Sequence, residues 1–154
     1  MDARVRDCTA PRLTVDDLAA MQPRYFEGFV AALWQKRGYG RVYVTPTQDG
    51  GIDVVAINRR SGDLIQCKTS STEGAKLGWD AVKDVAGGYA LYAKRHPKID
   101  FTKVCVTNQF FNATAHKMAG HNGVEIVERP ALEGLLAIHE VTKWDVEKLL
   151  MNDW

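Results

Sequence analysis

The sequence is poor in cysteine and in surplus charge, and it lacks long apolar runs. Its three cysteines are odd in number and far apart, which argues against a disulfide framework and fits reduced thiols in a cytoplasm. No apolar run reaches the roughly 18 residues that span a bilayer, and no secretory signal opens the sequence. A net charge of +1 excludes a protein that coats a polyanion through its overall charge. We therefore expect a cytoplasmic protein with no membrane contact, whose binding to any nucleic acid depends on local charge.

The composition is that of one ordinary globular domain. Of the 154 residues, 45% are hydrophobic and 25% are charged, which excludes disordered and collagen-like classes. No internal repeat or low-complexity tract divides the chain. We expect an N-terminal arm with a short helix over residues 1–23, a main domain over 24–137 and a C-terminal helical extension over 138–154, which is a candidate oligomer contact.

Apolar spacing predicts a helix followed by strands. From residue 24 the apolar side chains recur every three or four residues, which predicts an amphipathic helix that Gly38 ends. Its apolar face comprises Phe26, Phe29, Val30, Leu33 and Trp34. The period then changes to two, and we expect strands at 42–44, 52–57 and 64–68, the last two joined in a hairpin by a loop over 58–62.

The second half alternates between helices and strands. A Ser/Thr/Gly-rich loop over 69–78 precedes a helix over 79–94, in which Gly87 and Gly88 indicate a bend or close packing. The order αβββαβαβα is completed by a strand at 104–106, a helix at 111–119, a strand at 124–127 and a helix from Pro130. This order predicts an α/β fold with a central mixed β-sheet flanked by helices, and the lack of a G-x-G-x-x-G motif excludes a doubly wound dinucleotide fold.

Polar side chains stand where the two strands of the predicted hairpin would meet. Asp53 lies at the start of the first strand, and Gln66 and Lys68 share one face at the end of the second, opposite Cys67. A carboxylate, an amide oxygen and an ammonium that converge are suited to metal-assisted cleavage of a phosphodiester.

Each of these residues also has an ordinary explanation. A Q-x-K string is common by chance, an aspartate after two glycines is often a turn residue, and a lysine at a strand end often serves only to keep the edge solvated. Asp49 is a second candidate carboxylate, although a capping role in the turn is the better expectation for it. Because the hairpin would bring Asp53, Gln66 and Lys68 together, the three residues jointly indicate a functional site more strongly than any one of them does alone.

Several strings together resemble the Mrr-like restriction endonuclease domain, a branch of the PD-(D/E)XK nuclease superfamily with a Q-x-K variant motif. The resemblance covers roughly residues 24–137 with its motifs in the right order. It rests on Phe26-Glu27 with Val30, Leu33-Trp34 and Arg37-Gly38-Tyr39, then Val44-Thr45, Asp49 to Val55, Ile65 to Lys68, Val106 to Asn108, Phe110-Phe111, Ala115, Ala119, Val124 to Val127 and Leu132.

The resemblance implies a mixed sheet flanked by helices and cleavage of DNA that depends on Mg²⁺, with Mn²⁺ able to substitute. It implies that Asp53 is the metal-binding aspartate, that Gln66 replaces the usual acidic residue and that Lys68 is the motif lysine. It also implies metal ligation by the backbone carbonyl of Cys67 and a supporting acidic role for Glu27, whose alternative is an exposed helix residue. Because Gln66 removes one negative charge from the metal site, Glu27 would restore it.

Four further residues are candidates for contact with nucleic acid. Two are basic and two are polar residues at a strand end, namely Lys76, Lys83, Thr107 and Asn108. Lysines bind the phosphate backbone through charge. Thr107 and Asn108 have an equally good alternative as helix-capping residues.

The function that follows is a divalent-metal-dependent endonuclease that acts on DNA, in a family that serves largely in bacterial restriction and defence against foreign DNA. One such site cuts one strand, so double-strand cleavage predicts a homodimer. Recognition or activation by a partner protein is also expected. The alternatives are a catalytically silent nuclease-fold module for DNA binding or assembly, and a nuclease for RNA or branched DNA.

Overall fold

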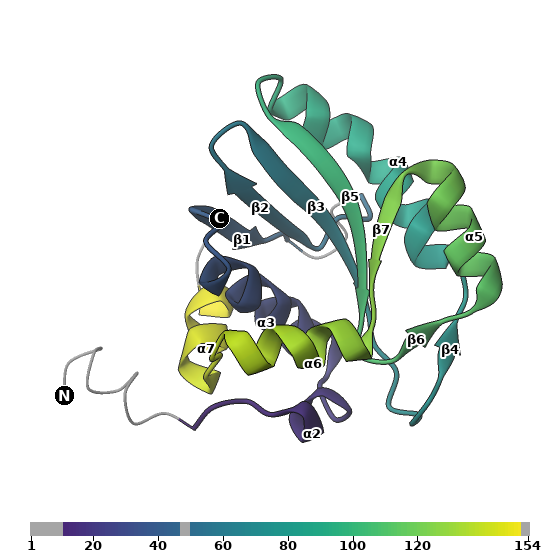
Figure 1. Ribbon diagram of the computed structural model, residues 1–154. Coiled ribbons are helices and arrows are strands. Elements are labelled where there is room, and N and C mark those ends of the chain that lie inside the picture. The colour runs from purple at the N-terminus through teal and green to yellow at the C-terminus, as the bar shows by residue number, and fades with distance from the viewer. Residues whose placement is uncertain (1–10, 47–49, 152–154) are drawn as a thin grey trace.

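A computed structural model describes residues 11–46 and 50–151 as helices on both faces of a mixed sheet (Figure 1). The strands are β1 (Arg41–Val44), β2 (Val54–Asn58), β3 (Ser61–Lys68), β4 (Lys76–Leu77), β5 (Asp100–Thr107), β6 (Phe110–Phe111) and β7 (Val124–Val127). The helices are α2 (Val15–Leu18), α3 (Pro23–Lys36), α4 (Asp80–Arg95), α5 (Ala113–Asn122), α6 (Arg129–Ile138) and α7 (Lys143–Met151).

The main sheet has five strands in the order β1-β2-β3-β5-β7, and β4 pairs with β6 in a separate two-stranded ribbon. Strands β1, β2 and β3 form an antiparallel meander, whereas β3, β5 and β7 run parallel. Each parallel step passes through a helix on the α4–α5 face, as expected for crossover connections. The predicted α/β class with a central mixed sheet is confirmed.

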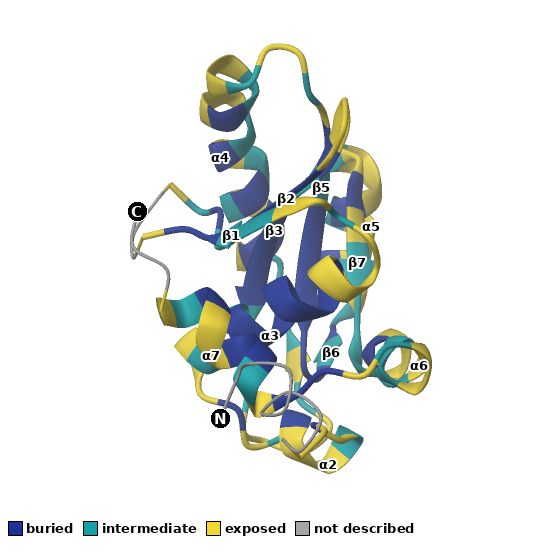
Figure 2. Ribbon diagram, turned by 90° about the vertical axis from the view of Figure 1, so that its left-hand side faces the viewer, coloured by how far each residue is buried: buried dark blue, intermediate teal, exposed yellow. Residues whose placement is uncertain are grey.

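Two apolar cores lie on opposite faces of this sheet. One face is covered by α3, with α2, α6 and α7 around it, and its core contains fully buried Phe26, Phe29 and Trp34. The other face is covered by α4 and α5 around Val82 and Tyr92. Figure 2 shows α3 buried against the strands, whereas α6 remains largely at the surface. Leu18 of α2 and Val146 of α7 belong to the first core, so both terminal helices pack on the main sheet unit.

The predicted first helix begins and ends as its sequence indicates. Pro23 occupies the first turn, where its missing N–H costs no hydrogen bond, and Gly38 follows the helix at φ 108°. The predicted hairpin also forms, but its turn is shorter than expected, because only Arg59 and Arg60 separate β2 from β3. Arg59 has φ 60°, the left-handed conformation that tight hairpin turns require.

The segment expected to be a loop over 69–78 contains β4. Its two residues pair in parallel with β6, so that Lys76 stands opposite Phe110. The strand predicted at 104–106 extends in both directions to Asp100 and Thr107. Both differences have one cause, since pairing with a neighbouring strand, rather than local apolar periodicity, sets these bounds.

Within the described residues, no helix is both long enough and apolar enough to cross a bilayer.

Candidate active site

The hairpin brings Asp53 beside Gln66 at the end opposite its turn. The register of β2 and β3 pairs Val54 with Ile65, and the amide of Asp53 donates to the Ile65 carbonyl over 2.8 Å. Asp53 and Gln66, which flank this pair, therefore lie opposite each other, as the predicted hairpin requires. Gln66 and Lys68 lie on the face that α4 covers, whereas the Cys67 side chain packs in the core beneath α3.

Asp53 is a carboxylate with little solvation. Its Oδ2 accepts one hydrogen bond, from the backbone amide of Cys67 at 2.8 Å. Burial raises the pKa of Asp53, and the negative charge of Asp84 raises it further, while the Cys67 hydrogen bond and the positive charge of Lys68 offset part of this rise. A partly desolvated carboxylate with one backbone donor has lone pairs left for a cation.

Gln66 faces oxygen atoms. Its buried amide group points at the carbonyl oxygen of Gly51 and at Oδ2 of Asp53. With the amide nitrogen turned toward them, Gln66 donates to both, at 3.1 Å to Asp53. With the amide oxygen turned toward them, three oxygens converge, an arrangement that a hard cation stabilises. The nitrogen-inward orientation satisfies both oxygens without a metal, so Gln66 becomes a ligand for Mg²⁺ or Mn²⁺ only when its amide turns its oxygen inward.

Lys68 stands at the open side of the site. Its Nζ lies 3.7 Å from Oδ2 of Asp84, and both side chains are less than half exposed. Asp84 belongs to α4 and was not predicted as a site residue. The sequence predicts its helix, but nothing in the sequence indicates which turn of that helix faces the hairpin.

Glu27 approaches the site from α3. Burial and the negative charge of Asp53 raise the pKa of Glu27, while a hydrogen bond and the charge of Arg24 lower it. Arg24 donates at 2.8 Å to Glu27 and at 2.9 Å to the carbonyl oxygen of Thr45, whose own amide donates to the carbonyl oxygen of Asp53. Glu27 is therefore a half-buried carboxylate in electrostatic contact with Asp53, rather than an exposed helix residue.

Cys67 contributes through its backbone. Its amide donates to Asp53, whereas burial raises the pKa of its thiol well above the ordinary value. Among the described residues, no group of three or more His, Cys, Asp or Glu side chains is placed to hold a metal ion. Asp49, the second candidate carboxylate, lies outside the described residues.

Thr107 and Asn108 need correction as candidate DNA contacts. Both are fully buried. Asn108 donates to the carbonyl oxygens of Leu18 and Ser70 and accepts from the Ser70 amide, while Thr107 accepts from the amide of Gln109. Asn108 thus ties the end of β5 to α2 and to the loop after β3, and both buried side chains are turned away from any phosphate at the surface.

The two candidate lysines lie at the surface. Lys76 is exposed on β4. Lys83, on α4, lies 3.2 Å from Asp80 and 4.8 Å above the ring of Trp79, so its charge is already partly matched. Lys83 precedes Asp84 in sequence, and this places it close to the site end of the sheet.

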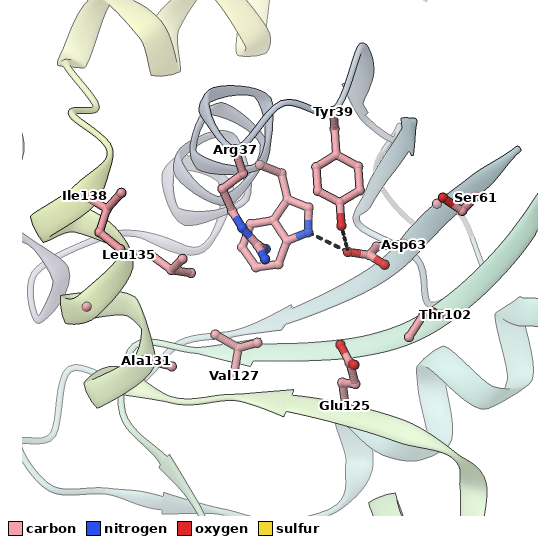
Figure 3. A pocket seen from close by; sticks show the side chains of 13 residues that line it. Arg37, Tyr39, Ser61, Asp63, Thr102, Glu125, Val127, Ala131, Leu135 and Ile138 are labelled. Carbon is pink, nitrogen blue, oxygen red and sulfur yellow. Dashed lines mark hydrogen bonds between the residues drawn. The ribbon is translucent and has the colours of Figure 1, made fainter. Parts of the chain in front are cut away.

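A pocket larger than the one beside Lys68 lies elsewhere in the molecule. A pocket of about 660 Å³ opens between α3, α6 and the face of β3, β5 and β7 that α4 does not cover. Figure 3 shows Asp63 in this pocket, where its Oδ2 accepts hydrogen bonds from Trp34 at 2.8 Å and from Tyr39 at 2.9 Å. Burial, followed by the charge of Asp63, raises the pKa of Tyr39 to about 12. The pocket contains none of the site residues predicted from the sequence.

Comparisons with known proteins agree with this fold. The Mrr_cat family, described as restriction endonuclease, matches residues 18–136, more than half of the chain. No protein with a curated description is significantly similar to the sequence.

Two solved structures share the fold. The crystal structure of AF1548, a protein of unknown function, has a TM-score of 0.56 and 22% identity, and the match covers 76% of this chain and 66% of that one. The MspJI restriction endonuclease, in complex with a 27-mer oligonucleotide, has a TM-score of 0.58 and 14% identity. The match covers 88% of this chain and 33% of MspJI, so this chain spans about a third of that enzyme. The chain therefore belongs to the Mrr_cat restriction endonuclease family, as its sequence motifs predicted, and it has the fold of a nuclease.

Proposed function

We propose that the chain is a divalent-metal-dependent endonuclease that hydrolyses phosphodiester bonds of DNA in defence against foreign DNA. The observation that carries this proposal is the convergence of Asp53, Gln66 and Lys68 at one end of the β2–β3 hairpin. Membership of a restriction endonuclease family supports the reaction class. The oligonucleotide bound to MspJI supports DNA as the substrate.

The proposed metal ligands are oxygen atoms. They are the Asp53 carboxylate, the Gln66 amide oxygen and the backbone carbonyl oxygen of Cys67, with Glu27 supplying the negative charge that Gln66 lacks. A bound Mg²⁺ or Mn²⁺ would polarise the scissile phosphate and lower the pKa of a water molecule. The raised pKa of Asp53 supports this assignment, because a carboxylate that burial destabilises is stabilised by a cation.

Lys68 has a separate role in the proposal. Its ammonium donates hydrogen bonds to the attacking water and to the phosphate, where negative charge increases in the transition state. Lys76 and Lys83 remain proposed contacts for the DNA backbone, because both are exposed or half-exposed cations and the overall charge of the chain is small. We also propose a homodimer for double-strand cleavage and a partner protein for recognition or activation.

Cleavage of supercoiled plasmid tests the proposal. Wild-type protein is incubated with plasmid in Mg²⁺, in Mn²⁺ and in EDTA, beside Asp53→Ala and Lys68→Ala. We expect nicked or linear plasmid with the wild type in either metal and none in EDTA or with either variant. Lys98→Ala is the matched control, since it removes an exposed lysine close in sequence to Asp100, which pairs with Ser61 at the end of the sheet opposite the proposed site.

Cleavage that persists in Asp53→Ala would contradict the assigned site. A wild-type protein that neither cuts nor binds Mn²⁺ would favour the silent module for DNA binding or assembly. Cleavage of RNA or branched DNA in place of plasmid would keep the site and change the substrate.

A further inference from the structure

Helix α4 approaches the site more closely than side chains usually permit. Gly51 has φ 86°, and a Cβ on it would collide with the backbone carbonyl of Asp84. One turn further along α4, a Cβ on Gly88 would collide with the carbonyl oxygen of Gly50 and lie 2.8 Å from Ile52. Glycines on both sides of the contact therefore let α4 lie directly on the turn that precedes Asp53.

This contact fixes the position of Asp84. Its backbone lies against Gly51, and its carboxylate lies 3.7 Å from the ammonium of Lys68. The Asp53 carboxylate is close enough to both groups that each changes its pKa, Lys68 downward and Asp84 upward. One ammonium is thus shared between two carboxylates that lie on different elements.

The two carboxylates differ in how strongly each would pair with the Lys68 ammonium. Asp53 is the more buried, and a charge pair is stronger where less water screens it. The lysine stem is flexible, and its ion pair with Asp84 opposes movement of the ammonium onto Asp53. Such a pair would occupy the oxygens that the proposed function assigns to a cation.

We propose that Asp84 is a positioning residue that holds the Lys68 ammonium away from Asp53 and so leaves the Asp53 carboxylate open to a divalent cation. The role of the cation in this inference rests on the proposed function, whereas the position of the lysine does not. It assigns no direct contact between Asp84 and the metal.

Mn²⁺ binding to the full chain tests the inference by calorimetry. The proteins are wild type, Asp84→Asn, Lys68→Met, the double variant and Asp53→Asn, with Asp80→Asn as a matched control on the same helix. We expect Asp84→Asn to weaken Mn²⁺ binding by about two- to fivefold, the range that one partly exposed charge pair contributes. In the Lys68→Met background, Asp84→Asn should change the logarithm of the Mn²⁺ dissociation constant by less than about half as much as it does in the wild type.

The pattern of results separates the possible roles of Asp84. An effect at least half as large without Lys68 would overturn the inference, because Asp84 would then act directly on the cation. No effect in the wild-type background would overturn it as well. Binding that survives Asp53→Asn would instead contradict the proposed function, which distinguishes the two failures.

A crystal structure of metal-free Asp84→Asn decides the position of the lysine without any metal. We expect the Lys68 ammonium within hydrogen-bond distance of the Asp53 carboxylate, where the wild type keeps it on Asp84. An ammonium that stays in place or turns to solvent would overturn the inference, whatever the calorimetry shows.

Discussion

Two aspartates of the same hairpin lie in opposite surroundings. Asp63, on the α3 side of β3, accepts two side-chain hydrogen bonds on one oxygen, from Trp34 and Tyr39. Asp53, at the other end and beside α4, accepts a hydrogen bond from the Cys67 backbone amide, faces the Gln66 amide and lies in the field of two further carboxylates. The first carboxylate is stabilised by the protein around it. The second is left with a raised pKa.

The two regions differ in size and in how their charges are matched. The larger hollow surrounds Asp63, where polar groups satisfy one another, so its carboxylate serves the fold. The Asp53 end contains like charges, and the amide of Gln66 faces two oxygens there. The proposed function assigns this surplus of negative charge to a divalent cation. The assignment of the site to the Asp53 end therefore rests on unmatched charge and not on the size of a pocket.

The largest expected effect is a difference in cleavage rate between a variant of Lys68, at the Asp53 end, and a variant of Arg37, in the larger pocket. Lys68→Met should lower metal-dependent plasmid cleavage by about 100-fold or more, because the developing charge on the phosphate loses its ammonium. Arg37→Met, which removes the cation beside Trp34 and Tyr39 in the larger pocket, should leave the cleavage rate unchanged. Initial rates of plasmid nicking measure both. Equal losses would remove the distinction between the regions.

The second prediction concerns the contact that builds the Asp53 end. Gly88→Ala should lower the free energy of unfolding by about 1–3 kcal/mol, because its methyl group meets the backbone of the preceding turn. Gly87→Ala is the matched control, since a Cβ there meets nothing within 4 Å and a helix interior gains up to about 1 kcal/mol from alanine. Urea denaturation measures whether the free energy of unfolding falls in Gly88→Ala and rises in Gly87→Ala. A tolerated Gly88→Ala would show that α4 does not need this approach.

The third prediction concerns the Asp63 end. Asp63→Ala leaves the indole N–H of Trp34 and the hydroxyl of Tyr39 without their acceptor, so the free energy of unfolding should fall by about 1–3 kcal/mol. Cleavage at a temperature where the variant is folded should remain at the wild-type rate. Urea denaturation and plasmid nicking measure the two quantities. A variant that is stable but inactive would make the larger pocket part of the active site.

The smallest expected effect is a pH dependence at Asp53. Because its pKa is raised in the folded protein, the folded state binds this proton more tightly than the unfolded state, and ionisation costs stability. That cost is absent below the ordinary aspartate pKa of 3.8 and complete above the raised value. Asp53→Asn should therefore stabilise the metal-free protein at pH 7 but not near pH 3.

Denaturation of both proteins across this pH range measures the difference. Saturating Mn²⁺ should reverse the gain at pH 7, since the cation stabilises only the protein that retains the carboxylate. A gain that is the same at both pH values would show that the ionisation of Asp53 is not its cause.

The sequence predicts well which polar side chains the hairpin brings together. A strand alternates its side chains and a hairpin pairs its ends, so Asp53, Gln66 and Lys68 follow from two local rules. The fold class follows from the order of helices and strands in the same way.

The remainder depends on contacts between distant segments. Asp84 reaches the site because Gly51 and Gly88 let one turn of α4 lie on the hairpin, and apolar periodicity does not specify that rotation. The sequence does not reveal that Asn108 is buried, because its partners, at residues 18 and 70, are remote in sequence. The two-residue strands β4 and β6 are too short to give a periodic signal.

The most direct test of the central claim is Mn²⁺ binding at pH 7 to wild type, Asp53→Asn and Asp63→Ala, measured by calorimetry on metal-free protein. We predict that wild type and Asp63→Ala bind Mn²⁺ with equal affinity and that Asp53→Asn loses this binding. Undiminished binding in Asp53→Asn, or its loss in Asp63→Ala, would contradict the assignment of the active site to the Asp53 end of the hairpin.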